Sequence, residues 1–202
     1  EMNMLDDKEF YEALQSINRT SQHLSNTIDD FRNFFSPNKE MNKFYVSQLI
    51  KKSKDLIKSR FDKFNIKVIE NIDDIEILSY QNELFQVILN LFSNSIDVLS
   101  SSQIENKIIY IKIYHDENNL YIEFLDNGGG IKDEFINRVF EPYFTTKHKS
   151  QGTGIGLYMS LQIVTKHLNG EISVKNDTFI HNNIKYFGAK FTILLPIHPK
   201  NS

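Results

Sequence analysis

The sequence predicts an α+β protein, a two-layer sandwich of helices stacked on one face of a mixed sheet, preceded by a long helix. From about residue 43 onwards, short apolar strand patterns alternate with longer helical patterns. Before them, apolar residues recur at strict 4-3 spacing over more than three heptads. The 202 residues suffice for one medium domain with a helical appendage, and two full domains would be tight.

The composition excludes several classes of function. The 26 acidic and 23 basic residues leave a formal charge of −3, so no strong field favours nucleic acid or anionic lipid. The absence of cysteine excludes disulfides, thiol nucleophiles and Cys-zinc sites. No apolar stretch approaches the roughly 18–20 residues of a membrane span. We therefore expect a soluble chain that contacts neither nucleic acid nor membrane, and the start at Glu1 suggests a piece of a longer protein.

The first predicted helix covers most of residues 1–37 and ends at Pro37. Its apolar positions form a heptad seam with one polar break, made of Phe10, Leu14, Ile17, Ser21, Leu24, Ile28, Phe31 and Phe35. An ordinary amphipathic helix packed on its own domain is one interpretation. Regularity of this length is more typical of a bundle helix, whose seam needs partner helices. The pattern therefore predicts dimerisation.

The remaining elements follow in chain order. Helical patterns cover residues 48–61, 82–99 and 155–168, with a short helix near 133–138. Strand patterns cover residues 66–72, 75–80, 107–116, 120–126, 171–176 and 188–197. The adjacency of 107–116 and 120–126 predicts an antiparallel hairpin. Gly170 is expected to be the C′ residue of the last helix.

A narrow polar stripe runs along the predicted helix 82–99. At 100° per residue its members share one side of the helix, and they are Glu83, Gln86, Asn90, Asn94 and Asp97. The rest of the helix is mostly apolar, so the stripe must face something polar. The amide oxygens of Asn90 and Asn94 suit a hard cation such as Mg²⁺. A buried polar network bonded to neighbouring loops is the alternative.

Two glycine motifs follow. In "LDNGGGI", Asp126 ends an apolar strand, and the glycines after it let the backbone approach a flat ligand closely. The Asp126 carboxylate could accept a hydrogen bond from an N–H group of such a ligand, for example adenine. Asn-Gly is also a hairpin signal, although the helical pattern after it argues against a simple hairpin.

In "QGTGIGLYMS", alternate glycines precede a helix whose N-terminal amides favour phosphate. This spacing matches neither the dinucleotide fingerprint nor a P-loop, and a flexible helix entry is the alternative.

The stretch "VFEPYFTTK" lies between the glycine motifs. Phe140 and Phe144 could anchor a mobile lid to the core. Lys147 could meet a phosphate, although taken alone it is more simply a solvated lysine on an edge loop.

In order and spacing, these stretches resemble the N, G1, F and G2 boxes of the ATP-binding domain of sensor histidine kinases. The boxes are Asn90-x-x-x-Asn94, Asp126-x-Gly128-x-Gly130, Phe140-Glu-Pro-Tyr-Phe144 and Gly152-x-Gly154-x-Gly156. The resemblance covers about residues 40–197 and extends to gyrase-type topoisomerases, Hsp90 chaperones and mismatch-repair ATPases. It implies a Bergerat-type fold for residues 38–202. It also implies that residues 1–37 are the second helix of a dimerisation and histidine-phosphotransfer hairpin.

The resemblance further implies an ATP-dependent phosphotransferase of a two-component phosphorelay, with ATP and Mg²⁺ as cofactors. Asn90 would bind Mg²⁺, Asn94 would support the metal and phosphates, and Asp126 would read adenine. The other implied nucleotide contacts are Gly128, Gly130, Lys147, Gly152, Thr153, Gly154, Ile155, Gly156 and Leu157. The γ-phosphoryl group would pass to a histidine and then to an aspartate of a response regulator receiver domain. The expected state is a homodimer through the first helix, in the cytoplasm, whether or not the parent is anchored in the inner membrane.

Two features depart from the family pattern. Many sensor kinases carry a basic phosphate contact three residues after the second asparagine, where this sequence has Asp97. None of the six histidines stands in the acceptor motif, in which His is followed directly by an acidic residue and by Pro a few positions on. We therefore expect the acceptor helix upstream of Glu1 and no autophosphorylation of this chain alone. His23, the nearest rival acceptor, falls on an outward position of the first helix.

Two other functions remain open from the sequence. One is an ATPase of the same superfamily that hydrolyses ATP, but hydrolysing relatives generally carry Glu as the general base where this chain has Asn90. The other is a regulator that binds nucleotide without kinase activity.

Overall fold

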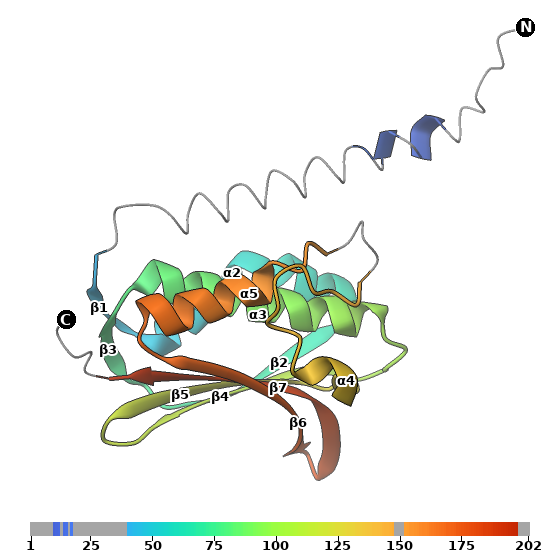
Figure 1. Ribbon diagram of the computed structural model, residues 1–202. Helices are drawn as coiled ribbons and strands as arrows, with labels where there is room; N and C mark the ends of the chain where they lie inside the picture. Colours follow the sequence, from blue (N-terminus) through green and yellow to red (C-terminus); the bar gives the residue numbers. More distant parts are fainter. Residues whose placement is uncertain (1–9, 13, 16, 18–39, 148–151, 198–202) are drawn as a thin grey trace, which may run out of the picture.

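The computed structural model describes residues 10–12, 14–15, 17, 40–147 and 152–197. Its elements are β1 (Asn42–Tyr45), α2 (Val46–Phe64), β2 (Ile66–Ile72), β3 (Glu76–Ser79), α3 (Gln81–Ser101), β4 (Lys107–His115), β5 (Asn119–Asp126), α4 (Asp133–Ile136), α5 (Gly156–Gln162), the π-helix η1 (Ile163–His167), β6 (Glu171–His181) and β7 (Ile184–Pro196). Helices α2, α3 and α5 lie on one face of a five-stranded sheet (Figure 1). The predicted α+β two-layer architecture is confirmed.

The five-stranded sheet is mixed, with the order β2-β4-β5-β7-β6. Strand β2 runs parallel to β4, and the other neighbours are antiparallel. Strands β4 and β5 form the predicted hairpin, in which Ile109 pairs with Asp126. At its turn the Asp116 carboxylate accepts the backbone N–H groups of Asn118 and Asn119 at 2.8 and 2.7 Å. This side-chain capping lets a loop without glycine reverse the chain.

The strand predictions need two corrections. Residues 75–80 yield β3, but β3 pairs with the unpredicted β1 in a separate two-stranded sheet. The last two strands extend well beyond 171–176 and 188–197, because they continue to a tight turn at Asn182 and Asn183. Both asparagines have positive φ, 51° and 61°. A type I′ hairpin turn requires this conformation at both central residues, and asparagine adopts it at low cost.

The predicted helix 155–168 also differs in detail. After α5 the backbone continues as the π-helix η1. The 3.6-residue periodicity of apolar side chains does not distinguish such a segment from a continuing α-helix. The assignment of Gly170 as C′ was wrong, since Leu168 is the C-cap and Asn169 takes the left-handed conformation with φ of 51°. Gly170 serves close packing instead, because a Cβ there would lie 2.3 Å from the carbonyl oxygen of Leu194 in β7.

The main core lies between the sheet and α2 and α3. Phe92 of α3 is fully buried and packs edge-on against Phe61 of α2 and Phe124 of β5, with centroids 5.4 and 5.0 Å apart. These contacts hold α3 against both α2 and the sheet, so close packing keeps the helix from rotating about its own axis. The polar stripe of α3 is therefore fixed in space.

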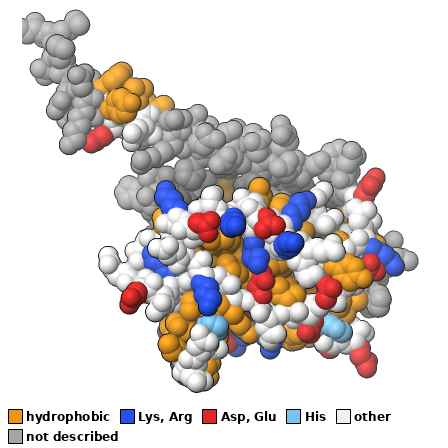
Figure 2. Space-filling view, turned by 180° about the vertical axis from the view of Figure 1, so that it is seen from behind, with side chains coloured by type: hydrophobic (Ala, Val, Ile, Leu, Met, Phe, Trp, Pro, Cys, Tyr) orange, Lys and Arg blue, Asp and Glu red, His pale blue; other side chains and the backbone are white. Residues whose placement is uncertain are grey.

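The described part of the first predicted helix is helical at residues 10–12, 14–15 and 17. The seam residues Phe10, Leu14 and Ile17 are exposed in the single chain. The seam from Ser21 to Phe35, and His23, lie outside the described residues. Among the described helices, none combines the length and the apolar character that a bilayer crossing demands. Lysine, arginine and acidic side chains are interspersed over the face in Figure 2, with hydrophobic side chains between them.

Candidate functional site

A pocket of about 340 Å³ lies between α3, the sheet and the segment that leads into α5. Ten residues that are predicted ligand contacts line it, namely Asn90, Asn94, Asp126, Gly130, Lys147, Gly152, Thr153, Gly154, Gly156 and Leu157. Gly128 and Ile155 are not in the lining, although Gly128 contacts Asp126 and Ile155 directly precedes α5. The volume suits a small-molecule ligand. The fold thus brings together motifs that are separated by more than 60 residues of sequence.

Asp126 is the buried carboxylate of the pocket, with 4% of its surface exposed at the end of β5. Burial raises its pKa to about 6, although hydrogen bonds from the N–H groups of Gly128 and Ala189 and from the Ser95 hydroxyl oppose the rise. The Gly128 N–H donates to Oδ1 at 2.8 Å. At neutral pH the group is mostly an ionised acceptor, so it can accept an N–H of a ligand in the pocket.

The loop after Asp126 is held by asparagine side chains. The Asn127 side chain accepts the N–H of Ile108 at 2.8 Å and donates to the carbonyl of Asn106 at 2.7 Å. The Asn176 side chain of β6 does the same for Ile131, at 2.8 and 2.7 Å. These hydrogen bonds hold the loop that connects β5 to α4, where the sequence left a simple hairpin turn as the alternative. Asn176 was not foreseen, since nothing in its local sequence separates it from an ordinary strand residue.

The two amides of α3 face the pocket differently. Asn90 donates from Nδ2 to the buried Ser160 hydroxyl at 2.8 Å, which leaves its Oδ1 as the oxygen available to a ligand. Gly156 lets the start of α5 approach this oxygen, because a Cβ there would lie 2.5 Å from it. In Asn94, Oδ1 faces Lys147 at 3.5 Å and the buried Nδ2 has no hydrogen-bond partner among the described residues. A buried N–H of this kind needs an acceptor, which an ordered water or a bound ligand can supply.

Both phenylalanines of the predicted lid segment are anchored. Phe140 meets Phe191 of β7 edge-on, with centroids 6.4 Å apart, and packs against the main core. The ring centroids of Phe144 and Phe135 lie 5.5 Å apart. The segment between them is thus attached to the domain at two points.

Lys147 is not the solvated lysine of the simpler interpretation. Its Nζ lies 2.7 Å from Oδ2 of Asp97, and its side chain is 29% exposed. Asp97, whose role the sequence left open, also pairs with Arg60 of α2. No local pattern in α2 points to Arg60, because its partners lie more than 30 positions away.

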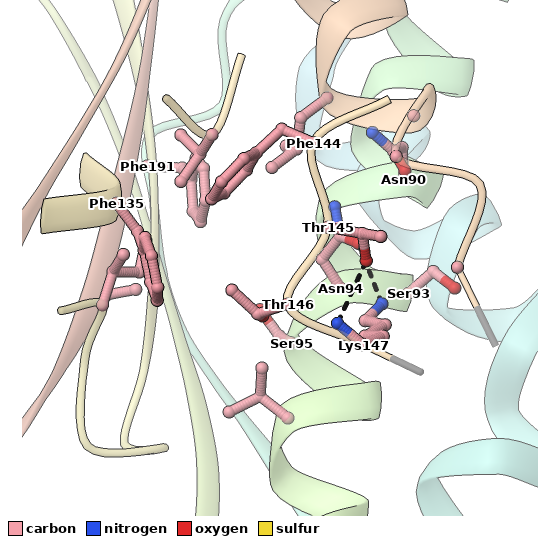
Figure 3. Close-up of a pocket in the computed structure, with 18 of the residues that line it drawn as sticks. Asn90, Ser93, Asn94, Ser95, Phe135, Phe144, Thr145, Thr146, Lys147 and Phe191 are labelled. Atoms are coloured by element: carbon pink, nitrogen blue, oxygen red, sulfur yellow. Dashed lines mark hydrogen bonds between the residues drawn. The ribbon is translucent and has the colours of Figure 1, made fainter. Parts of the chain in front are cut away.

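The pocket has two unlike sides. Figure 3 shows Asn94 and Lys147 on one side, facing Phe135 and Phe191 across the cavity. Sequence analysis did not predict the remaining lining residues, which are Ser93, Ser95, Val98, Ile131, Phe135, Val139, Thr145, Thr146, Ala189 and Phe191. Phe144 also lines the pocket, although it was predicted only as an anchor of the lid segment. Their apolar members follow the same periodicity as core residues, so no pattern separates them. One flat apolar wall opposite amides and a cation matches a ligand with a planar ring and an anionic chain.

The donor set also limits the metal that the pocket could hold. Among residues 40–147 and 152–197, no three histidine, aspartate or glutamate side chains gather as ligands. A cation there would rely on an amide oxygen, ligand oxygens and water, which is the coordination that Mg²⁺ favours. The free Oδ1 of Asn90 fits such an ion.

Comparison with known proteins supports these observations. The family described as "Histidine kinase-, DNA gyrase B-, and HSP90-like ATPase" matches residues 79–199. Sporulation kinase E of Bacillus subtilis is 32% identical over 155 residues, which are 76% of this chain and 19% of that protein. Signal transduction histidine-protein kinase AtoS of Escherichia coli is 28% identical over 159 residues, 78% of this chain and 24% of that protein. The chain therefore spans about a fifth to a quarter of the length of these relatives.

Among solved structures, the catalytic domain of histidine kinase ThkA is similar, with 26% identity and a TM-score of 0.64. The similarity covers 78% of this chain and 96% of that domain. A complex of ThkA with the response regulator protein TrrA gives a TM-score of 0.72 at 23% identity, over 99% of this chain and 55% of ThkA, and shows the fold alone.

Proposed function

Since this chain belongs to the histidine kinase-, DNA gyrase B- and HSP90-like ATPase family, we propose that it is the ATP-binding catalytic part of a sensor histidine kinase. The observation that carries the proposal is one pocket that joins the buried Asp126 to the amides of α3 and to Lys147. Adenine would lie against the apolar wall and donate its amino N–H to Asp126. The phosphates would extend toward Asn94 and Lys147, whose donors suit anionic oxygens.

We assign the cation to the Oδ1 of Asn90, with Asn94 oriented toward the phosphates. When bound, Mg²⁺ supplies charge neutralisation of the triphosphate and polarises its terminal phosphoryl group. The backbone of Gly152, Gly154 and Gly156 would contact the phosphates where the chain enters α5. The domain's contribution to transfer is then positioning and electrostatic stabilisation rather than covalent chemistry.

The reaction would move the γ-phosphoryl group from ATP to a histidine nitrogen. The bond between the γ-phosphorus and the bridging oxygen breaks, a P–N bond forms, ADP leaves, and the imidazole proton passes to the carboxylate beside the acceptor histidine. No histidine of this chain stands in the acceptor motif, so we place the acceptor on another segment of the parent protein. A response regulator receiver aspartate would accept the phosphoryl group next.

The proposal predicts that this chain with Mg·ATP gains no stable phosphohistidine and hydrolyses ATP very slowly. An amide at Asn90 cannot take a proton from water as a glutamate would. A separate peptide carrying the acceptor helix of the parent should restore acid-labile, base-stable labelling, measured with γ-³²P-ATP.

Three results would contradict this prediction. Labelling of the chain alone, lost on His23→Gln or on His115→Gln, would place the acceptor within this sequence. His115 is the relevant second position because Asp116 follows it directly. Steady ATP turnover without any acceptor would instead favour the hydrolysing ATPase, and labelling of neither chain nor peptide despite nucleotide binding would favour the regulator.

We further propose that residues 1–37 are a bundle helix that mediates a homodimer. The exposure of Phe10, Leu14 and Ile17 supports this, since a heptad seam is stable only when covered. Dimerisation should be weak, because a four-helix bundle needs a hairpin from each subunit. We expect the light-scattering mass to increase with concentration, and Leu14→Asp to abolish the increase. A strict monomer at millimolar concentration would contradict this proposal.

A further inference from the structure

Three segments meet at one carboxylate on α3. Oδ1 of Asp97 lies 2.8 Å from Nη2 of Arg60, on α2. Oδ2 of the same group lies 2.7 Å from Nζ of Lys147, in the segment that follows the F box. Each oxygen thus has its own cation, and the partners lie 37 and 50 positions away in sequence.

Both cations are also bonded to residues that line the pocket. Nη1 of Arg60 donates to the Ser93 hydroxyl at 2.8 Å, and Nζ of Lys147 lies 3.5 Å from Oδ1 of Asn94. Ser93, Asn94 and Lys147 all line the pocket. The three charged groups sum to +1, so the cluster is net attractive to an anion even though an aspartate is at its centre.

Stability of the fold does not account for this arrangement. The three side chains are 29–37% exposed, and ion pairs at such positions add little to the stability of a fold. A free lysine side chain samples many rotamers, and two fixed contacts confine it before any ligand binds. Such preorganisation reduces the entropy lost on binding.

The cluster and the buried carboxylate of Asp126 approach the pocket from different sides of α3. Ser95 hydrogen-bonds Asp126, and Asp97 is two residues further along the helix. At 100° per residue the two side chains point about 160° apart around the axis. With the ring of a ligand at Asp126, we place the end of its anionic chain, rather than the beginning, at Lys147.

We propose that Asp97 is a positioning residue that holds Lys147 for the terminal phosphate of a nucleoside triphosphate, while Arg60 neutralises Asp97 so that it does not repel the ligand. This inference rests on the proposed function and deepens it. The cluster would make the site prefer triphosphate over diphosphate. Many sensor kinases carry a basic phosphate contact where this chain has Asp97. In this chain the positive charge would come instead from Arg60 of α2 and from Lys147.

The test is a double-mutant cycle on the ratio of the Kd for ADP to the Kd for ATP, both with excess Mg²⁺, by calorimetry. Lys147→Met should lower the ratio about tenfold, the effect of one charge-assisted hydrogen bond. Asp97→Asn, which keeps the shape and removes the charge, should lower it about fivefold. In the Lys147→Met background Asp97→Asn should add less than twofold, since it acts through the lysine. Asp55→Asn, an exposed aspartate of α2, is the charge-matched control and should change nothing.

Other outcomes separate the alternatives. If Asp97 merely repelled phosphate, Asp97→Asn would raise the ratio in both backgrounds, which would overturn the inference. A structural role would weaken ADP and ATP equally and leave the ratio unchanged, which would also overturn it. If the chain without substitutions bound neither nucleotide, the proposed function would be overturned, and the inference with it.

Discussion

Replacing Asp126 with alanine is expected to weaken ADP binding by roughly five- to 150-fold. The carboxylate is 4% exposed, and its removal would leave the adenine amino group without an acceptor in a closed site. An unpaired buried N–H costs about 1–3 kcal/mol, which corresponds to that loss of affinity. Calorimetric titration of the parent and the variant with ADP measures it. Equal affinities would remove adenine recognition from the role of Asp126.

The raised pKa of Asp126, about 6, adds a second signature. Aspartate in an unfolded chain titrates near 3.9, so between about pH 4 and 6 the folded, nucleotide-free state binds more protons. The contribution of this group to the free energy of unfolding therefore decreases as pH rises through that window, and its full cost is present at pH 7. The ionised form is the better acceptor, so adenosine affinity should increase as pH rises through 6.

Asp126→Asn provides the control, because its side chain has nearly the same shape and does not titrate. Adenosine is the appropriate probe, since it has no phosphate that ionises in the same range. We expect the parent to show the increase between pH 5 and 7 in an NMR titration and Asp126→Asn to show none. A parallel pH dependence in both proteins would assign the titration to another group.

Replacing Asn90 with alanine is expected to weaken ATP binding at least roughly tenfold, or about 1.4 kcal/mol, when Mg²⁺ is present, with a much smaller loss in excess EDTA. The reason is that Oδ1 of Asn90 is assigned to the cation, whereas Nδ2 is already bonded to Ser160. The measurement is the pair of titrations with and without metal.

Asn71→Ala, which removes an exposed amide from β2, is the matched control and should change neither titration. The two roles of Asn90 are separable by this design. If losses with and without Mg²⁺ were equal, the residue would act only by holding α5 to α3 through Ser160.

The features that depend on local periodicity could be predicted from the amino-acid sequence. The polar stripe of α3 follows from the 3.6-residue repeat of a single helix, so Asn90 and Asn94 could be placed on one side without a structure. The hairpin of β4 and β5 follows from the short connection between two apolar strands. The order of the four motifs was enough to place Asp126 and the glycine loop in one site.

Features built from side chains that are distant in sequence became visible only in the folded chain. Asp97 was unexplained until Arg60 and Lys147, 37 and 50 positions away, were placed beside it. The apolar wall formed by Phe135 and Phe191 was equally hidden, because a residue that lines a pocket and one that fills a core obey the same hydrophobic pattern. Periodicity reports which side of an element is apolar. What that side meets depends on how the elements pack against one another.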